Sequence, residues 1–141
     1  MNKRVMLSVT GTQRYADQDP EVIELATEGT MCLQDGGWEI TYQESVLTGL
    51  EGVQTTFRIE PQKVTLTRSG KLQSQMVFQQ GVAHDSLYQM EFGTLMIRVC
   101  ASQVFFDITP DGGMIDLAYE IEIENSAAGV IDYHLDIRAI E

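Results

Sequence analysis

The chain has 141 residues, 43% of them hydrophobic, and a formal net charge of −12 at pH 7. This length fits one domain, so we expect a single domain over residues 1–141. So acidic a surface repels phosphate backbones and anionic headgroups, and neither nucleic-acid nor membrane binding is expected.

The first residues lack the continuous apolar core of a signal peptide, and no apolar run approaches the ~20 residues of a membrane-spanning helix. A cytoplasmic location is therefore expected. Cys32 and Cys100 are too few for a disulfide framework. We expect both cysteines to be reduced, half-buried strand residues.

Alternating apolar and polar residues, the pattern of half-buried strands, run through nearly the whole chain. No window shows the apolar spacing of a helix. In chain order, the alternation predicts strands at 5–9, 23–33, 38–42, 53–59, 64–66, 72–78, 84–92, 95–99, 104–108, 115–123 and 131–137.

Turn-forming residues separate these runs, and the clearest are Asp35-Gly36-Gly37, Pro61-Gln62, Ser69-Gly70 and Pro110 to Gly113. A loop is predicted from Asn125 to Gly129. Short connections favour an all-β, antiparallel, up-and-down barrel, whose closure removes exposed strand edges. Eleven runs would make the first and last strands parallel. We therefore expect one run to split, merge or lie outside the barrel, or the closure to be irregular.

Several strand and turn segments carry a family resemblance. They are 5–13 (VMLSVTGTQ), 23–30 (IELATEGT), 47–52 (LTGLEG), 68–70 (RSG), 74–78 (SQMVF) and 92–95 (FGTL). Together they resemble the YwiB-like family of bacterial proteins, a domain of unknown function, over nearly the full length. The resemblance implies a calycin-like barrel, the architecture of lipocalins and fatty-acid-binding proteins, in a bacterial cytosol. It implies no particular activity.

Polar residues whose side chains should point into the barrel, according to the alternation, are the candidates for a functional site. They are Thr27, Tyr42, Glu44, Thr55, Arg68, Ser74, His84, Ser86, Tyr88, Tyr119 and Tyr133. In a simple meander, Glu44 and Arg68 lie near one mouth of the barrel. His84 begins its strand at the opposite end, and Tyr88 lies nearer the middle.

One interpretation of this interior is a pocket for a small, partly apolar ligand. Arg68 would bind an anionic group, and Ile40, Leu66 and Met76 would form aliphatic walls. The ligand-binding residues predicted on this interpretation are Tyr42, Glu44, Arg68, Ser74, His84 and Tyr88.

The alternative is a barrel filled by its own side chains, with Glu44 and Arg68 as an ion pair at the rim. Its outer face, or a loop that exposes Leu50, would then contact a protein partner, such as a second copy in a homodimer. A plug at the barrel end is the simpler role for Leu50.

The C-terminal hairpin carries Asp132, His134 and Asp136 on one face. Pairing Glu124 with Val130 would place Glu120 opposite His134 and oppose Glu122 to Asp132. A divalent cation would relieve that repulsion. This face alternates with apolar residues and is expected to be the outer, solvated one, so no metal site is predicted.

No GxSxG, P-loop or GxGxxG motif occurs. His84 and Asp85 are sequence neighbours, so on a strand their side chains point to opposite faces. We therefore predict no catalytic residue and no cofactor, and a non-enzymatic protein.

Overall fold

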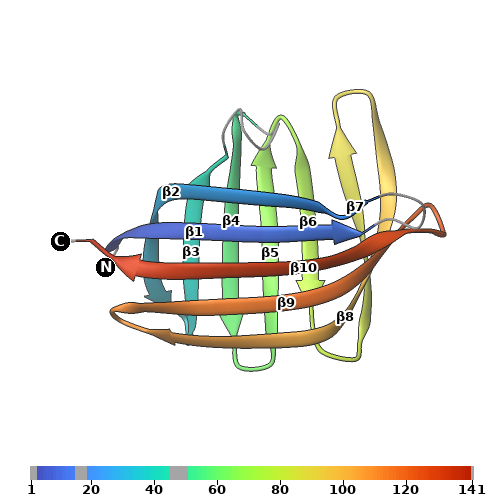
Figure 1. Ribbon diagram of the computed structural model, residues 1–141. Helices are drawn as coiled ribbons and strands as arrows, with labels where there is room; N and C mark the ends of the chain where they lie inside the picture. Colours follow the sequence, from blue (N-terminus) through green and yellow to red (C-terminus); the bar gives the residue numbers. More distant parts are fainter. Residues whose placement is uncertain (1–2, 15–18, 45–50, 141) are drawn as a thin grey trace.

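Ten strands account for most of the residues that the computed structural model describes, which are 3–14, 19–44 and 51–140 (Figure 1). They are β1 (Lys3–Arg14), β2 (Glu21–Gln34), β3 (Gly37–Gln43), β4 (Val53–Glu60), β5 (Lys63–Gly70), β6 (Gln73–Phe78), β7 (Ala83–Met90), β8 (Gly93–Thr109), β9 (Gly112–Ile123) and β10 (Ser126–Ala139).

Each strand pairs with its neighbours in the chain, and β10 pairs antiparallel with β1, which closes the barrel. The predicted all-β, antiparallel up-and-down barrel is confirmed. A calycin relationship beyond this barrel stays a prediction. No helix in the described part of the chain is long and apolar enough to cross a membrane.

The strand count is ten because the predicted runs 95–99 and 104–108 are one strand, β8. A β-bulge joins them: Ala101 pairs with Tyr119 and Gln103 with Ala118, so Ser102 is the extra residue. At the bulge, the inward-facing residues switch from odd-numbered to even-numbered positions. The alternation in the sequence is therefore interrupted, although the strand continues. An even number of strands then makes β1 and β10 antiparallel.

The longest strands pass from one wall of the barrel to another. In Figure 1, β2 runs across the view and then bends down, and β8 descends before it turns across. β2 leaves β1 and joins β3 around Gly29. A Cβ at Gly29 would lie 2.5 Å from the Thr41 carbonyl oxygen and 2.9 Å from Leu7 Cδ1, so only glycine fits this corner.

The predicted register of the C-terminal hairpin is wrong. The turn between β9 and β10 consists of Glu124 and Asn125, with φ of 51° and 67°, and β10 begins where a loop to Gly129 was predicted. A bulge between Ala127 and Gly129 shifts the pairing again.

As a result, His134 lies opposite Asp116 instead of Glu120. Asp132 lies opposite Ala118, so the expected repulsion between Glu122 and Asp132 does not arise.

The position of Phe92 also differs from the prediction. It lies beyond the end of β7 and is 86% exposed, although the alternation placed it on a strand.

One end of the barrel is filled by apolar side chains. Its largest fully buried members are Phe57, Phe78, Leu7, Met31, Ile40, Ile115 and Leu135. This end is the rim where β1, β5 and β9 begin. Because this end is closely packed, any internal space lies near the opposite rim.

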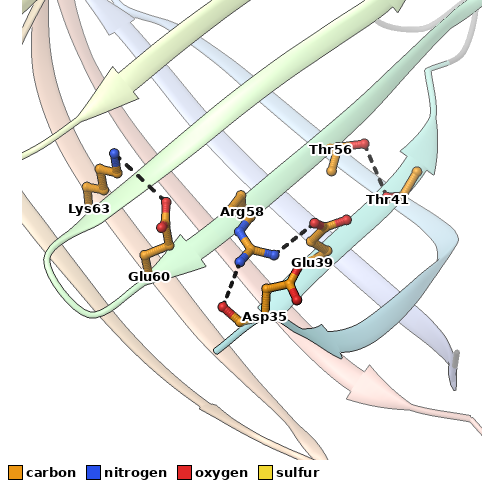
Figure 2. A network of polar contacts seen from close by, with 7 residues as sticks. All are labelled: Asp35, Glu39, Thr41, Thr56, Arg58, Glu60 and Lys63. Carbon is orange, nitrogen blue, oxygen red and sulfur yellow. Dashed lines mark hydrogen bonds and ion pairs between the residues drawn. The ribbon is translucent and has the colours of Figure 1, made fainter. Parts of the chain in front are cut away.

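The outer face carries short-range polar pairs between neighbouring strands (Figure 2). Arg58 on β4 donates to Glu39 on β3 at 2.9 Å and to the Asp35 carbonyl at 3.2 Å. The hydroxyls of Thr41 and Thr56 lie 3.1 Å apart on the same two strands. These contacts support the β3–β4 register from the solvent side.

Candidate functional site

A cavity of about 380 Å³ lies inside the barrel at the rim opposite the packed end. Because the strands alternate in direction, β1, β3, β5 and β9 end at this rim, and β2, β8 and β10 begin there. The polar residues that line the cavity are Gln13, Tyr42, Glu44, Arg68, Tyr88, Tyr119 and Tyr133. The others are Val9, Gly11, Ile23, Leu25, Met76, Ile97, Ile121, Ile123, Ala128 and Ile131.

Four of the six residues predicted to bind a ligand come together here: Tyr42, Glu44, Arg68 and Tyr88. Ser74 is buried next to them, between Arg68 on β5 and Tyr88 on β7 in the register, but does not line the cavity. The Ser74 hydroxyl has no hydrogen-bond partner among the described residues.

His84 lies apart from the other five, at the start of β7 and the opposite rim. Its Nε2 atom is 3.1 Å from Gln79 Oε1. Of the three predicted aliphatic wall residues, Met76 lines the cavity, whereas Ile40 and Leu66 belong to the packed core. The predicted Leu50 contact lies outside the described residues.

Sequence reasoning did not single out much of the aliphatic lining, including Ile23, Leu25, Ile121 and Ile123. Alternation shows which face of a strand a residue occupies, but not how far along the barrel it lies. That depth depends on how neighbouring strands are staggered.

A buried ion pair forms the polar centre of the cavity. Glu44 Oε2 accepts a hydrogen bond from Thr55 Oγ1 at 2.5 Å and lies 4.0 Å from Arg68 Nε. The Glu44 side chain is 2% exposed, and that of Arg68 is 19% exposed. Burial without a counter-charge would be costly for either residue, so each stabilises the other.

The Arg68 guanidinium is incompletely satisfied. Its Nε atom is buried and has no hydrogen-bond partner among the described residues, since 4.0 Å to Glu44 is too long for a hydrogen bond. Buried donors of this kind are rare in folded proteins. The side chain as a whole is 19% exposed and lines the cavity, so a ligand acceptor can approach the guanidinium from there.

Two tyrosines from different walls meet within the cavity. The hydroxyls of Tyr42 on β3 and Tyr133 on β10 are 3.5 Å apart. Burial, and then the negative charge of Glu44, raises the pKa of Tyr42 to about 12. Burial also raises the pKa of Tyr133 well above its usual value, and Tyr42 adds to the shift. Both tyrosines are therefore neutral near pH 7, and one hydroxyl can donate to the other while the second keeps its proton for another acceptor.

The cavity has walls of different character. Tyr42 on β3, Glu44 just after β3, Arg68 on β5 and Tyr88 on β7 form one wall, whereas the strands from β8 through β10 to β1 and β2 contribute nearly all the aliphatic side chains. Gln13, Tyr119 and Tyr133 are the polar residues on this second wall. The cavity thus suits a molecule with one polar end and an apolar body.

Residues 7–137 match the family described as "Domain of unknown function (DUF1934)". The chain belongs to this family. The DUF1934 chain is also similar in structure to the ywiB protein from Bacillus subtilis, with a TM-score of 0.89 and 21% sequence identity. The match covers 99% of this chain and 94% of the other, and it shows a shared fold. A search of curated proteins found no match.

The outer face of the DUF1934 barrel carries the other titratable cluster considered from the sequence. His134 Nδ1 lies 2.5 Å from Asp116 Oδ1, and its Nε2 lies 3.0 Å from Asp136 Oδ2. The hydrogen bond to Asp116, opposed by partial burial and reinforced by Asp136, raises the pKa of His134. No group of three or more His, Cys, Asp or Glu side chains within the described ranges could hold a metal ion.

Proposed function

We propose that this DUF1934 chain is a non-enzymatic binding protein for a small amphipathic molecule, whose anionic or acceptor end meets Arg68 inside the barrel. The observation that carries the proposal is the buried Arg68 Nε, a donor without an acceptor among the described residues, on a residue that lines a cavity of about 380 Å³. A ligand oxygen in the cavity would form a charge-assisted hydrogen bond with the partly exposed Arg68 guanidinium.

The size and lining of the cavity support the same function. Its volume falls at the small end of the roughly 300–1,000 Å³ typical of ligand pockets. The aliphatic wall would remove an apolar body from water, at about 0.8 kcal/mol for each buried methylene. The neutral hydroxyls of Tyr42 and Tyr133 can orient the polar end.

A native mass spectrum of the protein purified from its source organism tests the proposal directly, because a retained ligand adds a defined mass. A thermal-shift screen against fatty acids, tetrapyrroles and small anions complements it, since a ligand that binds only the folded state raises Tm. An unliganded spectrum together with no shift from any of the three classes would contradict the proposal.

Replacing Arg68 tests whether ligand binding depends on this residue or only on the net charge of the protein. We expect Arg68→Met to weaken binding of an anionic ligand by about tenfold to a hundredfold, because a charge-assisted hydrogen bond is lost. The matched control is Arg58→Met, which removes a glutamate-paired arginine from the outer face of β4 (Figure 2). Titration calorimetry with the best compound from the screen measures both.

Arg68→Met also leaves Glu44 buried without its cation, which destabilises the fold. The double variant Arg68→Met/Glu44→Gln removes both charges and keeps the comparison possible if the single variant does not fold. Unchanged affinity in a folded variant without Arg68 would exclude Arg68 as the anchor.

The alternative, a protein-interaction barrel, is supported by a different observation. On the outer face of the β7–β8 hairpin, Leu87 pairs with Met96, and Phe92 is exposed at its tip. Exposed apolar groups that lie together mark candidate contact surfaces. The subunit count in the same native mass spectrum tests whether the partner is a second copy.

A further inference from the structure

Gly11 is a glycine in the interior of β1 whose inward face lines the cavity. Its cross-strand neighbours are Ile23 on β2 and Tyr133 on β10, which also line the cavity. The inward residues before and after it on β1, Val9 and Gln13, both carry side chains that reach the cavity. Gly11 therefore leaves a gap in the row of side chains along this wall.

The backbone does not require glycine at this position. Gly11 is not among the glycines with positive φ, so a residue with a side chain can adopt its conformation. Among the described residues, a Cβ at Gly11 would have one neighbour within 4 Å, Tyr133 Cδ2 at 3.9 Å, which is ordinary contact.

Gly29 shows the contrast. A Cβ there would come within 3 Å of the Thr41 carbonyl oxygen, so the close approach of two strands explains that glycine. No such contact explains Gly11. Glycine also weakens a strand, because it costs more backbone entropy on folding and packs no side chain. What glycine provides at position 11 is space inside the cavity.

We propose that Gly11 determines ligand size: the apolar body of the ligand packs against the Gly11 backbone, between Ile23 and Tyr133, while its polar end is held at Arg68. This inference rests on the proposed function and makes it more specific. β1 and β5 lie on opposite sides of the closed barrel, so one molecule that meets both Arg68 and Gly11 spans the cavity (Figure 1). A straight-chain carboxylic acid has the required form, with an anionic end and a slender apolar body.

The experiment compares the affinities of a series of carboxylates, from butanoate to dodecanoate, for the wild type, Gly11→Ala and Gly11→Leu. We expect the wild-type affinity to rise with chain length up to a limit. This limit should move to shorter chains in Gly11→Ala and to still shorter chains in Gly11→Leu. The affinity should fall by about tenfold or more for each methylene that no longer fits. Titration calorimetry supplies the affinities.

Thr10→Leu is the matched control, because it introduces the same leucine side chain at the neighbouring, exposed position of β1. It should leave the chain-length limit unchanged. Thermal unfolding without ligand provides a second readout: Gly11→Ala should raise Tm, because alanine lowers the conformational entropy of the unfolded chain and meets no clash among the described residues.

The outcomes separate this inference from the function on which it rests. If the wild type binds no carboxylate and nothing else in the thermal-shift screen, the proposed function fails. If the wild type binds the series but Gly11→Leu is folded and keeps the same limit, the role of Gly11 is overturned and the proposed function stands. A fall in Tm for ligand-free Gly11→Ala would also overturn it, since glycine would then be needed by the fold itself.

Discussion

Arg68 and His134 are two cationic side chains held by carboxylates in different surroundings. Arg68 lies inside the barrel, where its ion pair with Glu44 is shielded from water. His134 lies on the outer face between Asp116 and Asp136, and its side chain is 35% exposed. Solvent and salt screen the second group more strongly than the first. The inner pair should thus matter for the site, and the outer group for the pH dependence of stability.

His134 should make the free energy of unfolding depend on pH. Both ring nitrogens face carboxylate oxygens, an arrangement that favours the doubly protonated, charged ring, and the pKa is raised above its ordinary value of 6.5. The folded state thus binds the proton more tightly than the unfolded state. The stabilisation is fully present below about pH 6.5 and is lost as pH rises through the higher pKa of the folded state.

The measurement is urea unfolding of the wild type and His134→Gln at about pH 5 and about pH 9. We expect the free energy of unfolding of the wild type to exceed that of the variant by a larger amount at the lower pH. The increase should be a few tenths to about 1 kcal/mol, because solvent screens the group. Comparing the two proteins cancels the pH dependence of their other acidic groups. An equal difference in free energy of unfolding at both pH values would show that folding does not increase the proton affinity of His134.

The β6–β7 interface is the weakest part of the barrel wall. β6 and β7 pair only at Gln73 with Gln89 and at Ser74 with Tyr88. Beyond that point their ladder stops, whereas β7 stays paired with β8 along its whole length. The Ser86 hydroxyl on β7 is buried and has no hydrogen-bond partner among the described residues. The barrel is closed in topology but has a short seam at this interface.

We expect backbone amides next to this seam to exchange hydrogen faster than those of the central strands. Segments 75–78 and 84–87 should show lower protection than segment 55–59, because β4 is paired along both edges. Hydrogen exchange followed by peptide mass spectrometry makes this comparison within one sample. Equal protection would indicate that the seam is closed in solution.

At the scale of elements, the sequence predicts strands well and their registration poorly. Alternation located the runs that became β1 to β7, and Asp35-Gly36 formed the expected turn before β3. The bulge at Ser102 could not be anticipated, because one extra residue looks like a break in the pattern. The β9–β10 register was missed since Glu124, a residue uncommon at positive φ, occupies a two-residue turn with Asn125.

The candidate site was predicted to a similar extent. Inward parity and strand direction were sufficient to bring Glu44 and Arg68 to one mouth of the barrel. They could not show that Ser74 stops short of the cavity, or that Gly11 faces it, because both depend on the stagger between strands.

At the scale of the whole molecule, the barrel is divided into a packed end and a hollow end. Phe57 is fully buried and its ring lies 5.7 Å from that of Tyr133, which lines the cavity. The two ends thus share a boundary of aromatic side chains. Stability should come mainly from the packed end, because side chains around a cavity already lack neighbours on one side.

Truncations at the two ends should therefore differ in cost. We expect Phe57→Ala to lower the free energy of unfolding by about 3–5 kcal/mol, because it removes a large, fully buried ring with neighbours on all sides. Leu25→Ala enlarges an existing space and should cost about 1–2 kcal/mol. Urea unfolding of both variants tests the division, and similar costs would show that the hollow end is as well packed as the other.

The pairing of β1 with β10, from Val5 with Ala139 to Arg14 with Val130, joins segments from nearly opposite ends of the chain. These contacts form only after β10 has been synthesised, and contacts so distant in sequence slow folding. Gly11 and Tyr133, which face one another across this junction, come from its two sides. The proposed site is thus complete only when β1 and β10 are paired, so a product that lacks β10 should bind no ligand and would leave the edge of β1 open to aggregation.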